Sequence, residues 1–292
     1  MAPPRYPGDI NITHRQDVYP GIDINGRLKG AAQGKIVYIT GASRGIGAAT
    51  ALAYARAGCR GLFLTSTSRS AADLQAVGQS LRAQVPGVEV EVCVADVTDE
   101  KAVKSSVDKC IEKFGRINVV IANAGYLEKW TKIGEIDPSE WWLSFVRGTF
   151  SVIHHSIRHL VATKGHAVLL SSGLAQILNP GSSGYATAKH ALNRLAEFIQ
   201  VEYGVEGVKV FSINPGGILT ALSSNEPWLP PHMTDTVELA SQSMVRLTSG
   251  TEDWLSGRYV NFQWDLDELE TKRKDIEEKD LLKNKLDVGS LA

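Results

Sequence analysis

A tyrosine and a lysine four residues apart could carry proton-transfer chemistry in this chain. Tyr185 and Lys189 lie in a stretch predicted to be helical, so their side chains share one face of that helix. A free tyrosine has a pKa of about 10, which is too high for efficient proton exchange at neutral pH. An ammonium group beside the phenol favours the phenolate and lowers this pKa. The spacing therefore predicts a general acid/base at Tyr185, tuned by Lys189.

A glycine-rich turn near the start of the chain could bind a phosphate. Residues 41–47 read Gly-Ala-Ser-Arg-Gly-Ile-Gly, between an apolar run and a helix rich in alanine. Glycines allow the backbone to approach a pyrophosphate closely, and the N-terminus of the helix offers unpaired N–H groups to it. Since the turn joins a first strand to a first helix, it predicts a dinucleotide site. The candidate contacts are Gly41, Ser43, Arg44, Gly45, Ile46 and Gly47.

The elements that must position these residues alternate along the chain. Short β-branched runs at 36–40, 62–65, 88–94, 117–122, 167–171, 208–212 and 258–262 are separated by stretches of helical period. This alternation predicts βαβ units and a parallel sheet. Several runs are apolar throughout, as expected of strands buried on both faces. The predicted fold class is α/β: a doubly wound, Rossmann-type parallel sheet of about seven strands in a single domain.

Three segments follow from this pattern. Residues 1–33 are rich in proline and glycine, and we expect an arm that lies over the domain or is partly disordered. Residues 34–264 form the Rossmann-fold domain. Residues 265–292 are a charged tail, predicted to be helical, with a narrow apolar stripe. That tail could dock on the body or a neighbouring subunit, and a dedicated partner-binding tail is the alternative.

The composition excludes several functional classes. The chain has 292 residues, with 31 Lys+Arg and 32 Asp+Glu, so a net charge of −1 gives no electrostatic case for nucleic acid or an anionic membrane. Its 3 cysteines form no CxxC pair, which argues against a disulfide framework. No apolar run approaches the roughly 20 residues that span a bilayer. The N-terminal residues lack a hydrophobic segment of the signal-peptide kind. These features predict a cytoplasmic protein.

The motifs together resemble the short-chain dehydrogenase/reductase family, and fungal NADP(H)-dependent members in particular. The resemblance covers residues 34–262 and rests on the glycine turn, Asn123-Ala124-Gly125 and the Tyr185/Lys189 pair in the family's order. It implies a Rossmann-type domain, a nicotinamide cofactor and hydride transfer between a carbonyl and an alcohol. It further implies that Ser172 polarises the substrate oxygen, with Ser171 as the alternative register, and that Lys189 also binds the cofactor ribose.

The resemblance implies further cofactor contacts at the ends of three predicted strands. One pair binds the adenine, one turn supports the sheet and the cofactor ribose, and one segment touches the nicotinamide. In this order they are Asp96 and Val97, then Asn123, Ala124 and Gly125, then Pro215, Gly216 and Thr220. A purely structural turn is the alternative for each.

The choice of nicotinamide cofactor can be argued from charge. A carboxylate after the second strand would hydrogen-bond the ribose 2′-OH of NAD(H) and repel a 2′-phosphate. Residues 64–69 contain none, whereas Arg44 can reach this region and Ser66 and Thr67 offer hydroxyls. The sequence therefore favours NADP(H) over NAD(H), with Arg44 as an ordinary surface arginine as the alternative.

One family element is missing. The family often carries an asparagine on the helix before the catalytic serine, where its backbone carbonyl holds a water that connects the lysine to solvent. Residues 141–150 contain no asparagine. Either Phe145 stands at its position, or three residues before Val146 are absent. Three residues are almost one helical turn, so their loss would rotate the following helix by about 60°. Both alignments put the proton relay in question.

The segment after the last cofactor contacts predicts a mobile lid over the substrate. It comprises residues 219–235, with Trp228 and Met233 as apolar contacts; a rigid connector packed by Trp228 is the alternative.

No metal site is predicted, because the histidines of 154–159 have no Asp, Glu or Cys beside them in sequence. Their helix resembles the one that packs between subunits in the family, which predicts a homodimer or homotetramer.

We therefore expect an NADP(H)-dependent reductase that acts on a small or medium carbonyl compound or its alcohol, a small-molecule partner rather than a nucleic acid or membrane. Because the asparagine is absent, two alternatives stand beside it: a cofactor-binding pseudoenzyme, and a non-redox biosynthetic catalyst on the same fold. The sequence predicts neither the substrate nor its stereochemistry, because pocket loops vary most within a fold.

Overall fold

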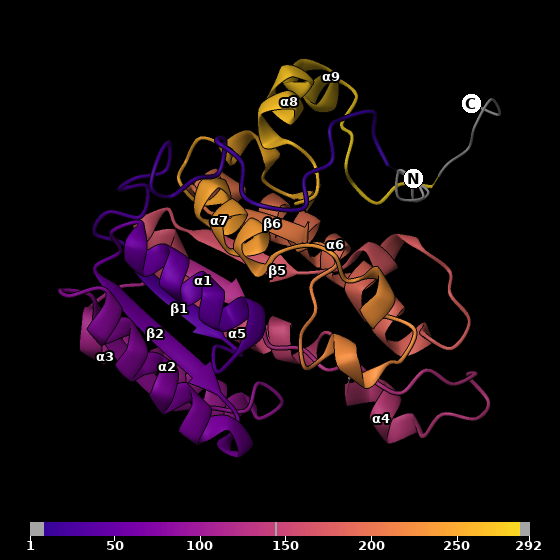
Figure 1. Cartoon of the computed structure of the whole chain (residues 1–292), viewed down its shortest axis with the longest axis horizontal. Helices are drawn as coiled ribbons and strands as arrows, with labels where there is room; N and C mark the ends of the chain where they lie inside the picture. The colour runs from indigo at the N-terminus through magenta and orange to yellow at the C-terminus, as the bar shows by residue number, and fades with distance from the viewer. Residues whose placement is uncertain (1–8, 144, 287–292) are drawn as a thin grey trace.

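Seven parallel strands form one sheet in the computed structural model, which describes residues 9–143 and 145–286. The order of the strands is β3-β2-β1-β4-β5-β6-β7 (Figure 1). Their bounds are β1 (Ile36–Thr40), β2 (Gly61–Ser66), β3 (Glu89–Val94), β4 (Val119–Ala122), β5 (His166–Leu170), β6 (Lys209–Asn214) and β7 (Arg258–Asn261). The prediction of a doubly wound parallel sheet of about seven strands is confirmed.

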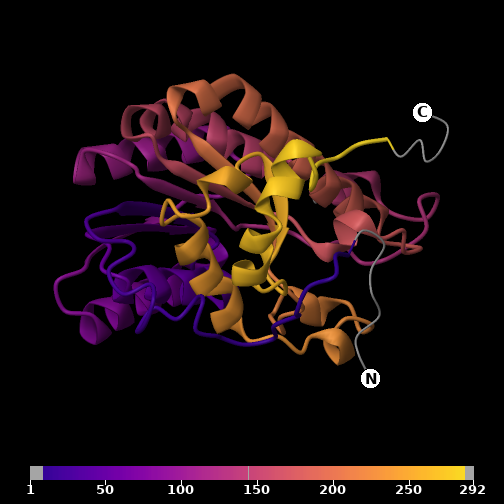
Figure 2. The same ribbon diagram turned by 90° about the horizontal axis from the view of Figure 1, so that it is seen from above.

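Helices cover both faces of this sheet, as Figure 2 shows from above. They are α1 (Gly45–Arg56), α2 (Ala71–Gln84), α3 (Glu100–Phe114), α4 (Pro138–Leu143), α5 (Arg147–Thr163), α6 (Ser183–Tyr203), α7 (Val237–Leu247), α8 (Leu266–Thr271) and α9 (Arg273–Glu278). Within the residues that the structure describes, none of them combines the length and the apolar character that a membrane crossing requires.

Alternate residues of β1 enter two separate apolar cores. Val37 and Ile39 of β1 pack with residues of α1, α2 and α7 on one face. Ile36 and Tyr38 of the same strand pack with residues of α3, α5 and α6 on the other. All of β1 is therefore buried, which explains why its sequence is apolar without alternation. This rigid sheet brings the residues at the carboxyl ends of its strands to one edge.

The N-terminal segment belongs to the first core over the part that the structure describes. Tyr19, Ile22 and Leu28 are buried in the cluster beneath α1 and α7. Main-chain hydrogen bonds run from Arg15 N to the carbonyl of Gln263 and from Asp265 N to the carbonyl of Thr13. This segment lies over the domain, alongside the C-terminal tail; residues 1–8 of the predicted arm lie outside the described residues.

The C-terminal tail covers the open edge of the sheet. Leu266, Leu269 and Ile276 of the short helices α8 and α9 are buried in the first core. Beyond α9, the carbonyl of Leu282 accepts a 2.9 Å hydrogen bond from the amide of Tyr259 on the edge strand β7. An exposed strand edge offers unpaired N–H and C=O groups, so the tail satisfies part of this edge within the chain.

Candidate active site

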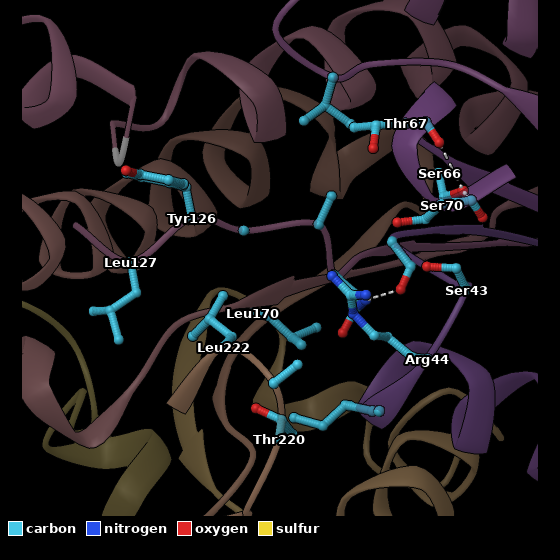
Figure 3. A pocket seen from close by; sticks show the side chains of 18 of the residues that line it. Ser43, Arg44, Ser66, Thr67, Ser70, Tyr126, Leu127, Leu170, Thr220 and Leu222 are labelled. Carbon is cyan, nitrogen blue, oxygen red and sulfur yellow. Dashed lines mark hydrogen bonds between the residues drawn. The ribbon is translucent and has the colours of Figure 1, made fainter. Parts of the chain in front are cut away.

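A cavity of about 420 Å³ opens at the carboxyl ends of the strands, where ligands bind in doubly wound sheets (Figure 3). It gathers residues from the turns after β1, β2, β3, β4, β5 and β6. The predicted site residues that line it are Gly41, Ser43, Arg44, Gly45, Ile46, Ser66, Val97, Asn123, Ala124, Gly125, Tyr185, Lys189, Pro215 and Thr220. The fold thus brings most of the predicted cofactor contacts to one place.

The remaining predicted residues are not among the described residues that line this cavity. They are Gly47, Asp96, Ser172, Gly216, Trp228 and Met233. Asp96 lies between two lining residues, Ala95 and Val97, and its carboxylate accepts hydrogen bonds from the amide and hydroxyl of Thr98 at 2.9 and 2.8 Å. Its predicted role toward an adenine stays a prediction.

The glycine turn is packed too closely to admit a side chain at two of its glycines, Gly41 and Gly47. A Cβ atom on Gly47 would lie 2.4 Å from the carbonyl oxygen of Gly41, well inside van der Waals contact. Gly41 itself has φ +65°, and a Cβ there would lie 2.9 Å from the Cα of Ala124. Gly45 and Ile46, at the N-terminus of α1, line the cavity. Unpaired N–H groups of this helix end face the cavity, which suits an anion.

The turn after β4 holds the glycine turn in place. The side-chain amide of Asn123 donates to the carbonyls of Thr40 at 2.8 Å and Gly41 at 3.0 Å. The amide of Ala124 donates to the hydroxyl of Thr40 at 3.0 Å. Asn123 therefore satisfies buried carbonyls at the end of β1, which is the structural reason for an asparagine at this position.

One end of the cavity is basic and rich in hydroxyls. Figure 3 shows Ser43, Arg44, Ser66, Thr67 and Ser70 gathered there. Arg69 also lines this end, although the sequence analysis predicted no role for it. The described lining residues include no carboxylate. An exposed carboxylate, Asp73 of α2, lies 3.9 Å from the guanidinium of Arg44 outside that lining. The donor set fits a phosphate group.

Tyr185 and Lys189 meet at the cavity from the first turns of α6. The ammonium of Lys189 lies 5.2 Å from the centre of the Tyr185 ring and donates a 2.6 Å hydrogen bond to the carbonyl of Leu170. Burial lowers the pKa of Lys189 to about 8. Burial also raises the pKa of Tyr185 to about 12, although a hydrogen bond with Ser172 opposes this rise.

The raised pKa of Tyr185 differs from the lowering that we expected from its lysine neighbour. Burial removes the phenolate from water, and this raises the pKa by more than the hydrogen bond with Ser172 lowers it. The buried ammonium is itself held by a backbone carbonyl. In the chain alone, the geometry therefore favours the protonated phenol, the form that donates a proton.

The two candidate serines have different partners. Ser171 donates its hydroxyl to the carbonyl of Lys189 at 2.8 Å, so its proton is committed to the backbone of α6. The hydroxyl of Ser172 accepts from the amide of Leu174 at 3.1 Å and hydrogen-bonds the side chain of Tyr185. Of the two residues, Ser171 lines the cavity, whereas Ser172 is the one whose hydroxyl lowers the pKa of the phenol.

The segment that lacks the family's asparagine is a break between two helices. Helix α4 ends at Leu143 and α5 begins at Arg147; residue 144 lies outside the described residues. The ring of Phe145 stacks on Trp141, with centroids 5.7 Å apart, and lies edge-on to Trp142 at 5.1 Å. Phe145 thus belongs to an aromatic cluster, and the backbone carbonyl that contacts Lys189 is that of Leu170.

The predicted lid is anchored at both ends. Ile218 and Asp235 form a bridge, and the carboxylate of Asp235 accepts a 2.6 Å hydrogen bond from the amide of Gly217. Between these anchors Trp228 is 51% exposed, with its ring 5.7 Å from that of Trp130. Thr220, Ala221 and Leu222 line the cavity at the start of the segment. The mobile lid and the rigid connector both stay predictions.

The segment between β4 and α4 holds residues that sequence reasoning missed. Tyr126 and Leu127 line the cavity on the side opposite Ser66 (Figure 3). Glu128 is buried and accepts a 2.7 Å hydrogen bond from the amide of Tyr185. The only signal in the sequence is their position directly after Asn123-Ala124-Gly125.

The histidines of α5 gather no metal site in the part of the chain that the structure describes. The imidazole Nε2 of His155 lies 3.6 Å from the carboxylate of Glu100 on α3. The sequence around His155 contains no carboxylate, so this contact could not be predicted from it. His154 stacks on Phe150 with centroids 5.7 Å apart. Both contacts are those of a surface helix.

Comparison with known proteins shows the family of this chain. The family model for short chain dehydrogenases matches residues 35–228. The short chain dehydrogenase mpl6 of Monascus purpureus is 35% identical over 95% of this chain and 96% of its own length. The short chain dehydrogenase pigC of Monascus ruber is 33% identical over 98% of this chain and 99% of its own length. A carveol dehydrogenase from Mycobacterium avium, solved in complex with NAD, has a similar fold, with a TM-score of 0.72 at 21% identity, covering 80% of this chain and 97% of its own.

Proposed function

Since the chain belongs to the short-chain dehydrogenase family of oxidoreductases, we propose that it reduces a small or medium carbonyl compound with NADPH, or oxidises the corresponding alcohol with NADP⁺. One observation carries the proposal: Tyr185 and Lys189 line the same cavity as the glycine turn. A dinucleotide held on that turn would extend along the cavity toward the phenol. The bound nicotinamide supplies the hydride.

The side chains divide the remaining work. Tyr185 donates its proton to the carbonyl oxygen during reduction and removes it from the alcohol during oxidation. Ser172, in contact with the phenol, orients and polarises the substrate oxygen. Lys189 binds the cofactor ribose, and its positive charge stabilises the phenolate left after proton transfer. Its pKa of about 8 in the chain alone rises where anionic phosphates enter the cavity.

The basic end of the cavity supports NADP(H) rather than NAD(H). Arg44 and Arg69 with the hydroxyls of Ser66, Thr67 and Ser70 offer a set of donors suited to a 2′-phosphate. The carveol dehydrogenase of similar fold holds NAD, so the fold itself does not exclude NAD(H). The proposal for NADP(H) rests on the side chains of this chain. Asp73, near Arg44, is the feature that opposes it.

Two further expectations belong to this proposal. Exposed apolar side chains on α5 and α6, including Phe150, Phe198 and Val201, support a homodimer or homotetramer built on these helices. A cytoplasmic location stays a prediction. The two alternative functions, a pseudoenzyme and a non-redox catalyst, rest on the missing asparagine alone.

The test replaces Tyr185 by phenylalanine. Wild-type protein should bind NADPH more tightly than NADH in a fluorescence titration and oxidise NADPH with members of a carbonyl panel. Tyr185→Phe should keep cofactor binding and lose about 1000-fold in kcat, because the proton donor is removed. Tyr203→Phe, the same change at the far end of α6, is the control and should leave both unchanged.

Three results would contradict the proposal. If the wild type binds neither cofactor, the reductase function fails. If it binds NADPH but turns over no carbonyl or alcohol, the pseudoenzyme is favoured. If the Tyr185→Phe protein forms product without oxidation of NADPH, the non-redox alternative holds.

A further inference from the structure

A buried carboxylate lies beside the acid/base residue and has no part in the reaction described above. Glu128 is 1% exposed and follows Gly125 by three residues, on the segment whose first residue holds the glycine turn. Burying a carboxylate is costly unless hydrogen bonds or opposite charges compensate it. The contacts of the Glu128 carboxylate therefore indicate what compensates the burial of its charge.

The carboxylate caps the helix that carries the acid/base pair. Oxygen Oε1 of Glu128 accepts a 2.7 Å hydrogen bond from the backbone amide of Tyr185. Helix α6 begins at Ser183, so this amide belongs to the first turn, whose N–H groups have no partner within the helix. The positive end of the helix dipole favours a negative charge there. Glu128 thus supplies an N-terminal cap from a segment 57 residues away.

The residue before the tyrosine leaves room for this contact. A Cβ atom on Gly184 would lie 2.8 Å from Oε1 of Glu128 and 3.1 Å from Cδ1 of Trp141. The indole nitrogen of Trp141 also donates to the hydroxyl of Ser183 at 3.2 Å. Ser183 and Tyr185 of the first turn are therefore held from outside the helix, by Trp141 of α4 and by Glu128.

We propose that Glu128 is a positioning residue for proton transfer, fixing the first turn of α6, and so the phenol of Tyr185, to the segment that supports the cofactor turn. This inference rests on the proposed function. Because Asn123 holds the glycine turn and Glu128 holds the helix, one short segment sets the distance between cofactor and acid. Misplacing a reacting group by about 1 Å can cost about 100-fold in rate.

The charge of Glu128 has a second, separable effect on the phenol. Among the described residues, those that act on the Tyr185 side chain are Glu128, the hydroxyl of Ser172 and the ammonium of Lys189. Burial raises the pKa of Tyr185 most, and the negative charge of Glu128 adds to the rise. The charge of Glu128 therefore adds to the preference for the protonated phenol that burial sets, and this form suits carbonyl reduction.

Two substitutions separate position from charge. Glu128→Ala removes both the acceptor and the charge, and we expect kcat to fall about 30-fold with little change in the KM for NADPH. Glu128→Gln keeps an acceptor oxygen, so kcat should stay within about threefold of the wild type. Its loss of charge should move the alkaline limb of the carbonyl-reduction profile to lower pH, because the phenol then ionises more readily. Glu135→Gln, the same change at an exposed position of this segment, is the control and should move nothing.

Gly184→Ala gives an independent test of position. It keeps the carboxylate but crowds it by steric contact, so its kcat should fall as that of Glu128→Ala does, while the protein keeps every ionisable group. This variant and Glu128→Gln decide the matter if Glu128→Ala does not fold.

A readout without turnover separates this inference from the proposed function. Hydrogen exchange of peptides from 183–189 should be faster in Glu128→Ala and unchanged in Glu128→Gln. The phenolate absorbance of Tyr185 is identified as the part of the alkaline titration that disappears in the Tyr185→Phe protein. This absorbance should appear at lower pH in Glu128→Gln than in the wild type. If the wild type reduces no carbonyl compound, the proposed function fails and these two measurements decide the role of Glu128. The inference is overturned if Glu128→Ala matches Glu135→Gln in kcat and exchange, or if Glu128→Gln loses as much activity as Glu128→Ala with no movement of the pH limb.

Discussion

The two ends of the cavity are built by different means. On the cofactor side, residues 40–47 and 119–125, backbone atoms, small residues and the side-chain amide of Asn123 form contacts too close to admit extra atoms. On the proposed substrate side, residues 126–143 and 219–235, large side chains such as Trp142 and Trp228 lie outside the cavity lining and are more than half exposed. The first arrangement suits one constant group, whereas the second can change from protein to protein without disturbing the sheet.

The sharpest test of this contrast places the same methyl group on each side. Gly47→Ala should lower the affinity for NADPH by at least about 100-fold, roughly 3 kcal/mol. The new Cβ would lie 2.4 Å from the carbonyl oxygen of Gly41, so the turn that binds the cofactor would have to shift. Gly134→Ala, on the substrate side, meets no atom within 4 Å and should bind normally. A fluorescence titration measures both. Equal affinities would show that the glycine turn does not hold the cofactor.

The second prediction concerns Lys189, where the two sides meet. Its folded pKa of about 8 lies below that of a free lysine, so the unfolded chain binds more protons between about pH 8 and 10 and stability rises with pH through that window. Lys189→Met should remove this contribution. At neutral pH the variant should gain about 2 kcal/mol of unfolding free energy, from about 3 for the buried charge less about 1 for the hydrogen bond to Leu170.

Chemical denaturation of both proteins at neutral and alkaline pH checks this prediction. The difference between them isolates Lys189, because the buried tyrosines and cysteines titrate in both. The difference should shrink as the pH rises toward 10, while carbonyl reduction by the variant is lost at every pH. If the variant is less stable than the wild type at neutral pH, the buried ammonium of Lys189 does not lower the free energy of unfolding, and the prediction is wrong.

Sequence reasoning placed residues in the cavity where one residue type is required by local geometry. The glycine turn and the Tyr185/Lys189 pair follow from backbone approach and helical spacing. Asn123, which the family resemblance implied, bonds to Thr40 and Gly41, 83 and 82 residues earlier in the chain. The strands were predictable for a similar reason, since burial on both faces leaves an apolar run. These features were read without knowing any distant contact.

The features that were missed depend on contacts between distant segments. Glu128 and the amide of Tyr185 are 57 residues apart, and no local pattern marks that carboxylate as buried. Arg69 reaches the cavity because β2 and β1 are neighbours in the sheet. The raised pKa of Tyr185 was missed because the spacing shows the lysine but not the depth of burial. Such properties require the three-dimensional packing.

The third prediction returns to the cofactor side and its basic end. Arg44→Ala should weaken NADPH binding about 10- to 100-fold, the value of a charge-assisted hydrogen bond, and leave NADH binding unchanged. Arg56→Ala, at the other end of the same helix, should change neither affinity. Parallel titrations with the two cofactors give the ratio. If Arg44→Ala weakens both equally, Arg44 supports the turn rather than a 2′-phosphate, and NAD(H) becomes the better choice.

The smallest effect is expected on the substrate side, at Trp228. Its ring is half exposed and packs on Trp130 and His232, so removing it should cost little stability. If residues 219–235 close over the substrate, Trp228→Ala should raise the KM for the carbonyl compound about three- to tenfold, with the Tm within a few degrees of the wild type. Val205→Ala, which removes an exposed apolar group in the turn between α6 and β6, is the control. A lower Tm with an unchanged KM would instead identify the segment as a rigid connector, and the contrast between a fixed cofactor side and an adaptable substrate side would not extend to this segment.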